Sequence, residues 1–256
     1  MANPALNDQR FQQAFQDLET AYHQPAFDGS RPRRMDLDGV ITKTGLLLAA
    51  LIASAFVGWQ TVDVPSDGRV EIPGFTLIAV LAAFGVAIWT GFNPKVARFT
   101  AVPYALLQGL AVGAISHVYE IEFDGIVLQA VGSTVGVFAI MLGLYRSGTL
   151  RATPAFRKGV IAATGAIVLV YLFDIVLRLF GADVPFIHDA GPLGIAISVA
   201  IVAVAAMNLI LDFDFIQRST SRGAPAYMEW YAGFGLLVTL VWLYLELLRL
   251  IGKLRR

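Results

Sequence analysis

Two acidic side chains lie inside long apolar stretches of the sequence, where a charge is costly. Asp212 stands near the end of the apolar stretch 192–215, and Glu246 stands inside the last one, 231–251. A charged side chain near the middle of a bilayer costs about 2.5–3.5 kcal/mol on insertion scales, so one that persists there usually faces a partner or water. These two acids are therefore the first candidates for chemistry.

The residues around Asp212 extend its polar face. Asn208 precedes it by four residues, so both side chains lie on one face of a helix, whereas Asp214 points about 200° away and lies nearer the helix end. We expect Asp212 to be buried and Asp214 to be in contact with water.

Glu246 shares a helix face with Arg249 and allows two interpretations. If Glu246 met Asp212 in a dry place, like-charge repulsion would leave the two carboxyls sharing one proton, and the pair would be a pH-sensitive latch. In the alternative, Glu246 pairs with Arg249, three residues further along, and Asp212 touches headgroup water. The residues alone leave both open.

Helix geometry sets a condition on the latch. With a rise of 1.5 Å per residue, Asp212 would lie about 12 Å from the cytoplasmic end of its helix, and Glu246 about 26 Å from that side in a helix starting at Glu229. The acids become level only if the segment 227–234 lies outside the membrane portion. Gly233 and Gly235 would then mark a break in the last helix.

The composition indicates an integral membrane protein. Of the 256 residues, 57% are hydrophobic and 15% are charged, and the mean hydropathy is +0.66. The formal net charge is zero, so we expect no nucleic-acid partner. The sequence has no cysteine, which removes thiolate chemistry and Cys-based metal sites, and we expect neither an enzyme nor a cofactor.

The hydropathy pattern predicts an all-α fold of seven transmembrane helices over residues 41–256. A membrane-crossing helix needs about 20 apolar residues. The seven stretches that approach this length are 44–59, 72–92, 99–119, 125–145, 158–180, 192–215 and 231–251. Residues 1–40 are polar and are predicted to be a largely disordered cytoplasmic arm. Within it, Arg10–Tyr22 has the apolar spacing of a helix that lies on the membrane surface, with a transient helix in a flexible tail as the alternative.

The basic residues of the loops predict the orientation. Between the first and last helices, eight Lys and Arg fall on the side of the N-terminus and one on the other side, which places the N-terminus in the cytoplasm. Seven crossings then put the C-terminus outside. The tail nevertheless carries Arg249, Lys253, Arg255 and Arg256, which favour the cytoplasm, so a half-crossing by the last segment is the alternative.

Two GxxxG motifs predict close helix packing. Gly109 and Gly113 form one, and Gly132 and Gly136 form the other. Such glycines let helix backbones approach closely in lipid, and we expect both motifs to pack inside the bundle, with dimerisation as the alternative.

At several of these stretches the sequence resembles the Bax inhibitor-1 family, the transmembrane Bax inhibitor motif proteins, and specifically its bacterial branch. The resemblance covers residues 38–256. The segments that carry it, in order, are 40–48 (VITKTGLLL), 104–116 (YALLQGLAVGAIS), 125–130 (GIVLQA), 208–216 (NLILDFDFI) and 242–246 (WLYLE). Together, in this order, they are specific.

The resemblance implies a seven-helix fold with a central last helix and a calcium leak gated by pH through acids on the sixth and seventh helices. Asp212 matches the first of these acids. Glu246 stands where relatives commonly carry aspartate, and Gln108 stands where they usually carry glutamate. The second helix also has no arginine of the kind that closes the latch in some relatives.

Two functions follow as hypotheses. In the first, the protein is a passive, pH-responsive cation leak in the plasma membrane of a bacterium, and ionised Asp212 and Glu246 offer oxygen ligands to passing Ca²⁺, with Asn208, Gln108, Asp214 and Arg249 as supporting polar groups. In the second, it is a non-conducting scaffold that binds or restrains a membrane protein such as a protease.

Overall fold

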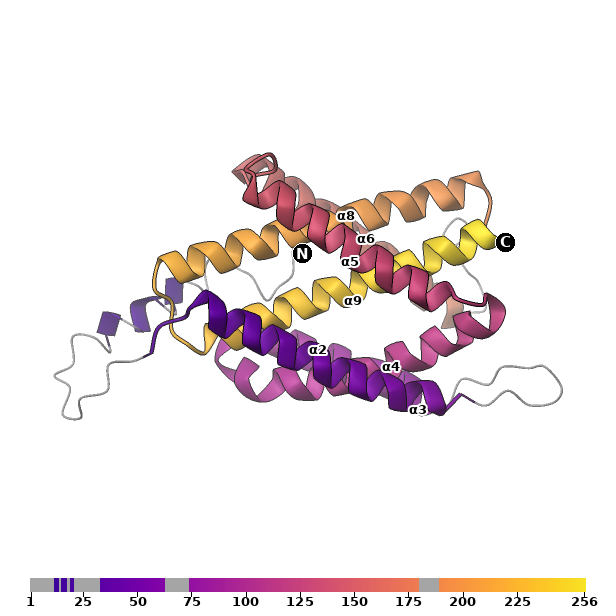
Figure 1. Ribbon diagram of the computed structural model, residues 1–256, viewed down its shortest axis with the longest axis horizontal. Helices are drawn as coiled ribbons and strands as arrows, with labels where there is room; N and C mark the ends of the chain where they lie inside the picture. Colours follow the sequence, from indigo (N-terminus) through magenta and orange to yellow (C-terminus); the bar gives the residue numbers. More distant parts are fainter. Residues whose placement is uncertain (1–11, 14, 18, 21–32, 63–73, 180–188) are drawn as a thin grey trace. The chain divides into compact units, whose positions relative to one another are not determined.

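The computed structural model describes residues 12–13, 15–17, 19–20, 33–62, 74–179 and 189–256. Seven long helices make up most of this part of the chain (Figure 1). They are α2 (Leu37–Gln60), α3 (Gly74–Phe92), α4 (Ala97–Glu122), α5 (Ile126–Arg146), α6 (Pro154–Leu179), α8 (Pro192–Ser221) and α9 (Met228–Arg255). Among the described residues, all seven are long and apolar enough to cross a membrane. The predicted all-α, seven-helix class is confirmed.

The helix ends differ from the apolar stretches because polar caps extend the helices. α2 begins at Leu37 instead of residue 44, since the Asp36 side chain accepts a hydrogen bond from the Gly39 N–H and caps the first turn. Asp38 and Lys43 lie in these first two turns and hide them from a hydropathy pattern. α2 therefore starts four residues inside the segment predicted as the arm. Within Arg10–Tyr22 the structure describes residues 12–13, 15–17 and 19–20, which are helical as predicted, and most of the rest of the arm lies outside the described residues.

The last helix is the most buried of the seven. In α9, 67% of the residues in its apolar window are buried, against 22% in α5 and 11% in α6. Helices that face lipid keep apolar side chains exposed, whereas a central helix is enclosed by protein on most sides. The predicted central position of the last helix is confirmed.

The chain forms two compact units, and α8 and α9 contribute to both. One comprises Tyr119–Leu211 and Thr239–Arg256, with α5, α6, most of α8 and the second half of α9; we call it the C-terminal unit. The other comprises Asn3–Val118 and Asp212–Val238, with α2, α3, most of α4, the end of α8 and the first half of α9; we call it the N-terminal unit.

Close packing of α2 against α4 holds the N-terminal unit together. A Cβ atom added at Gly109 would overlap Ser54 Oγ and the Leu51 carbonyl, and one added at Gly113 would overlap the Ala55 carbonyl. The two helices lie side by side in Figure 1. The first GxxxG motif thus packs inside the fold, as predicted, because only glycine lets these backbones approach so closely.

The second GxxxG motif does not pack inside the fold, and this expectation was wrong. Gly132 is exposed and Gly136 is half-buried on α5, and no described atom stands within 4 Å of a Cβ added at either position. Both helices carry the same motif, but glycine is required only in α4, where the neighbouring helix α2 occupies the space that a side chain would fill.

A buried ion pair joins the starts of α2 and α9 in the N-terminal unit. The buried Glu229 carboxylate pairs with Lys43 and also accepts the Asp36 backbone N–H at 3.2 Å. A Cβ at Gly39 would overlap this carboxylate. The segment before α2 also pairs with the α8–α9 loop, since Met35 donates its backbone N–H to the Ala224 carbonyl at 2.7 Å.

α9 continues through Gly233 and Gly235 without a break, so the break that these glycines would mark if the two acids were level does not occur. Gly233 serves close packing instead: a Cβ there would lie 3.0 Å from Thr44 Oγ1 of α2. The glycine is explained by a neighbouring helix and not by a turn in its own.

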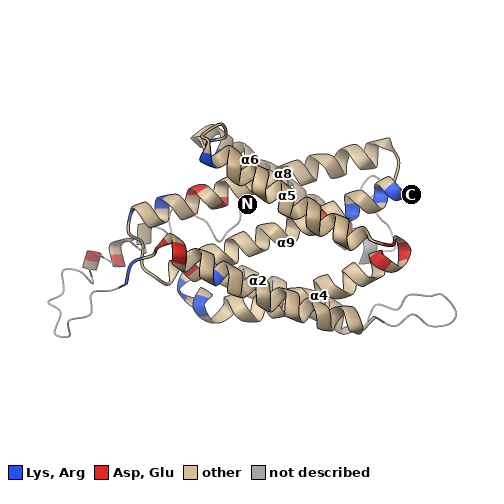
Figure 2. Ribbon diagram, viewed as in Figure 1, with Lys and Arg blue, Asp and Glu red and all other residues tan. Residues whose placement is uncertain are grey.

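The basic tail is held by local partners in the C-terminal unit. Arg256 pairs with Glu122 at 2.9 Å, and Arg255 donates to the Asp124 carbonyl at 2.8 Å. Most charged residues of the ribbon lie toward helix ends (Figure 2). The end of α9 therefore lies beside the α4–α5 turn. Three long helices lead from the start of α2 to that turn, and seven lead to the end of α9. Because both numbers are odd, the contact supports a full crossing by α9 over a half-crossing.

Gly109→Ala should destabilise the protein because the new methyl group overlaps α2. We expect the free energy of unfolding to fall by about 1–3 kcal/mol, the usual cost of overpacking. Denaturation in mixed detergent micelles measures it.

Gly132→Ala is the matched control, since it changes the same motif position where space is open. We expect no loss of stability from it. Equal losses in the two variants would contradict the packing described for Gly109.

Candidate functional site

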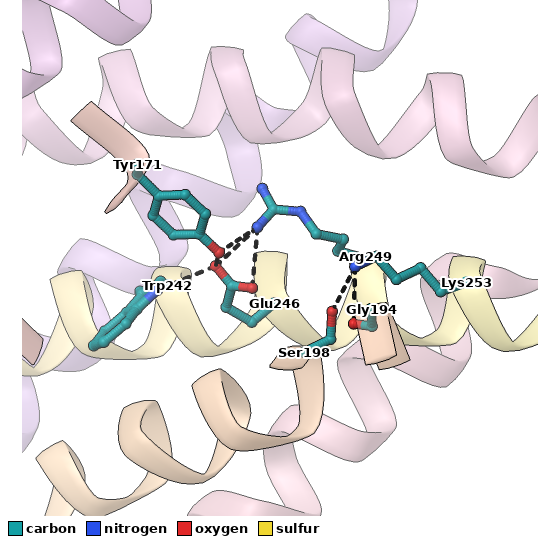
Figure 3. Close-up of polar contacts among 7 residues, drawn as sticks. All are labelled: Tyr171, Gly194, Ser198, Trp242, Glu246, Arg249 and Lys253. Atoms are coloured by element: carbon teal, nitrogen blue, oxygen red, sulfur yellow. Dashed lines mark hydrogen bonds and ion pairs between the residues drawn. The ribbon is translucent and has the colours of Figure 1, made fainter. Parts of the chain in front are cut away.

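Glu246 is held by donors from two helices of the C-terminal unit (Figure 3). Its carboxylate is 2% exposed. The Tyr171 hydroxyl of α6 donates to Oε1 at 2.7 Å, and the Trp242 indole N–H donates to the same oxygen at 3.3 Å. Arg249 contacts both oxygens, at 3.2 and 3.1 Å. The acid is thus surrounded by hydrogen-bond donors.

Tyr171 and Arg249 also contact each other. The Arg249 guanidinium donates to the Tyr171 hydroxyl at 2.5 Å and lies 5.2 Å from the centre of the ring. Tyr171 therefore accepts from Arg249 while it donates to Glu246, and each group fixes the orientation of the other two. Acid, phenol and guanidinium form a closed triangle.

This triangle fits an ionised Glu246. An ionised carboxylate only accepts hydrogen bonds, and three side chains here donate to it.

Lys253 lies two turns further along the same face of α9. Its ammonium donates to the Ser198 hydroxyl at 2.9 Å and to the Gly194 carbonyl at 3.1 Å, both in the first turns of α8. Figure 3 shows Glu246, Arg249 and Lys253 following one another along α9. The second half of the last helix thus carries a line of charged groups inside the C-terminal unit.

Asp212 belongs to the N-terminal unit and Glu246 to the C-terminal unit. Asp212 is 1% exposed. Asp214 is half-buried and pairs with Arg218 at 2.7 Å. The expected order, with Asp212 the more buried of the two, is confirmed. A proton shared by Asp212 and Glu246 stays a prediction.

The supporting polar residues lie in both units. Asn208 is buried and donates to Thr164 Oγ1 at 2.8 Å and to the Val204 carbonyl at 2.9 Å, so it links α8 to α6. Gln108 is half-buried on α4 in the N-terminal unit. Within the described residues, no three His, Asp or Glu side chains stand together as a metal ion would need.

The comparison with protein families agrees with this architecture. The profile of a family described as Bax inhibitor 1 like matches residues 3–256. The chain belongs to this family. None of the curated proteins gives a match. This match to the Bax inhibitor 1 like family confirms the resemblance found in the sequence, and it extends over nearly the whole chain.

In this member of the Bax inhibitor 1 like family, sequence reasoning missed three residues of the site: Tyr171, Ser198 and Lys253. Lys253 was treated as a tail charge, although it continues the face of Glu246 and Arg249 by four residues. Tyr171 and Ser198 give no such signal, because they meet α9 only through the packing of α6 and α8.

Arg249→Met should destabilise the protein because the buried Glu246 carboxylate loses its charged partner. We expect the free energy of unfolding in mixed micelles to fall by about 3–5 kcal/mol. The double variant with Glu246→Met should recover much of that loss, since it removes the stranded charge.

Arg256→Met is the control, because its pair with Glu122 is about half exposed at both side chains. Such surface pairs contribute about 0–1 kcal/mol. A double variant no more stable than Arg249→Met alone would show that Glu246 does not depend on Arg249.

Proposed function

We propose that the protein is a passive cation leak, with Ca²⁺ as the favoured ion, whose conductance depends on pH through Asp212 and Glu246. One observation carries the proposal: a carboxylate 2% exposed in the last of seven apolar helices is held by Tyr171 and Arg249 from two helices. Ionisable groups kept in a membrane interior commonly mark ion or proton pathways.

The two acids would act through their charge. Ionised Asp212 and Glu246 attract a cation and offer it hard oxygen ligands, whereas protonated carboxyls do neither. We therefore expect the leak to rise as pH rises through the titration of these groups. The closed triangle at Glu246 adds a mechanical component, because its hydrogen bonds depend on whether that acid carries a proton.

The proposed setting is the plasma membrane of a bacterium, with the N-terminus in the cytoplasm. The excess of basic residues in the loops on that side supports this orientation. The four basic residues near the C-terminus do not oppose it, since each has a local partner in the C-terminal unit.

The test is Ca²⁺ flux into dye-loaded proteoliposomes from about pH 4, near the ordinary carboxyl pKa, to about pH 8. Asp212→Asn and Glu246→Gln keep the side-chain shapes and remove the charges. Each should hold the flux near its low-pH value at every pH. A wild type with no more flux than empty vesicles would end the proposal.

Asp214→Asn is the matched control, because it removes an acid two residues from Asp212 that already pairs with Arg218. It should leave the pH response unchanged. The double variant of Asp212 and Glu246 then tests the shared proton. If the two acids titrate as one unit, each single variant already removes the whole pH response and the double variant adds nothing; if they titrate independently, each single variant keeps part of the response and only the double variant removes it.

The second candidate function is a non-conducting scaffold for a membrane protein such as a protease. One observation favours it: Tyr171, Trp242 and Arg249 satisfy Glu246 without any ion. Cross-linking in native membranes discriminates between the two functions. A stoichiometric protein partner, together with no flux in the purified protein, would support the scaffold.

A further inference from the structure

The groups that surround the Lys253 ammonium are of the kind that bind cations. Lys253 is 7% exposed, and its ammonium is held by a backbone carbonyl, Gly194, and a hydroxyl, Ser198. Carbonyl and hydroxyl oxygens are the ligands with which proteins replace the hydration shell of hard metal cations. An ammonium has three donors and no acceptor, so it occupies such oxygens in the same way.

The oxygens, more than the helix dipoles, hold the ammonium in place. Lys253 stands in the last turn of α9, whose carbonyl end favours positive charge, but it contacts the amino end of α8, which disfavours it. These two effects oppose each other. The hydrogen bonds to Gly194 and Ser198 are therefore what a buried charge needs at this point.

Lys253 also lies on the line that leads to Glu246. The two residues are seven positions apart on one face of α9, about 10 Å along the helix, and Arg249 lies between them. The three side chains together carry one net positive charge. A metal cation that reached Glu246 from the C-terminal end of α9 would have to displace this ammonium or be repelled by it.

We propose that Lys253 is a tethered cation that fills a metal-cation position formed by Gly194 and Ser198, and that it restricts the leak by occupying that position. Withdrawal of the ammonium would free the two oxygens for a hard cation of the kind the leak carries. This inference rests on the proposed leak and adds to it a residue that competes with the permeating ion.

The experiment uses full-length protein in proteoliposomes with Ca²⁺ as the probe. Lys253→Met keeps the length of the side chain and removes its charge. At the pH where the wild type conducts least, we expect the flux to rise about tenfold. This is the ratio that a fall of about 1.4 kcal/mol in the barrier to permeation gives. Lys253→Arg keeps the charge and should keep the flux low.

Two further variants show whether the position itself matters. Arg255→Met removes an exposed basic residue from the same helix end and should leave the flux unchanged. Ser198→Ala removes one oxygen that holds the ammonium and should give a rise between those of wild type and Lys253→Met. It also serves as the test if Lys253→Met does not fold.

The outcomes separate this inference from the proposed function. If the wild type carries no Ca²⁺ at any pH, the leak itself is wrong. If the wild type conducts and responds to pH but neither Lys253→Met nor Ser198→Ala raises the flux, the tethered cation alone is wrong. An equal rise in Arg255→Met would also overturn it, because loss of any positive charge at this end would then suffice.

Discussion

The structure depends on one constraint: a charged side chain among apolar helices must be paired with an opposite charge or hydrogen-bonded. Glu246 has Arg249 and Tyr171, Glu229 has Lys43, and the partners come from neighbouring turns or other helices. Unpartnered charges would cost far more in such surroundings than hydrogen-bonded ones. The polar groups therefore join helices that apolar contacts alone would leave free to slide, and they do so in each unit separately.

Glycine supplies the complementary means of holding helices in place. Hydrocarbon side chains gain little by leaving lipid for protein, so helices associate through close backbone approach and polar contacts. Gly109 and Gly113 allow that approach between α2 and α4, whereas Gly132 and Gly136 of α5 face open space. A GxxxG motif thus permits close packing, but the neighbour that uses it is set by the fold.

The sequence predicts the helices well and the site only in part. All seven helices and the central last helix follow from apolar length and the family resemblance, because crossing a bilayer leaves little choice of structure. The Glu246–Arg249 pair follows from a three-residue spacing on one helix. Tyr171 could not be found, since 75 residues separate it from Glu246. The close packing of Gly233 on Thr44 could not be found either, because these two residues are still further apart in sequence.

The basic tail shows how partners alter the interpretation of charge. An orientation predicted from the Lys and Arg of the loops assumes that these side chains have no partner within the protein and respond only to the two sides of the membrane. Arg255 and Arg256 bind the α4–α5 turn, and Lys253 and Arg249 bind groups within the C-terminal unit. Charges engaged in this way stabilise a helix end and carry less information about orientation. The tail charges therefore do not contradict the orientation that the loops predict, and one of the four, Arg249, binds Glu246 itself.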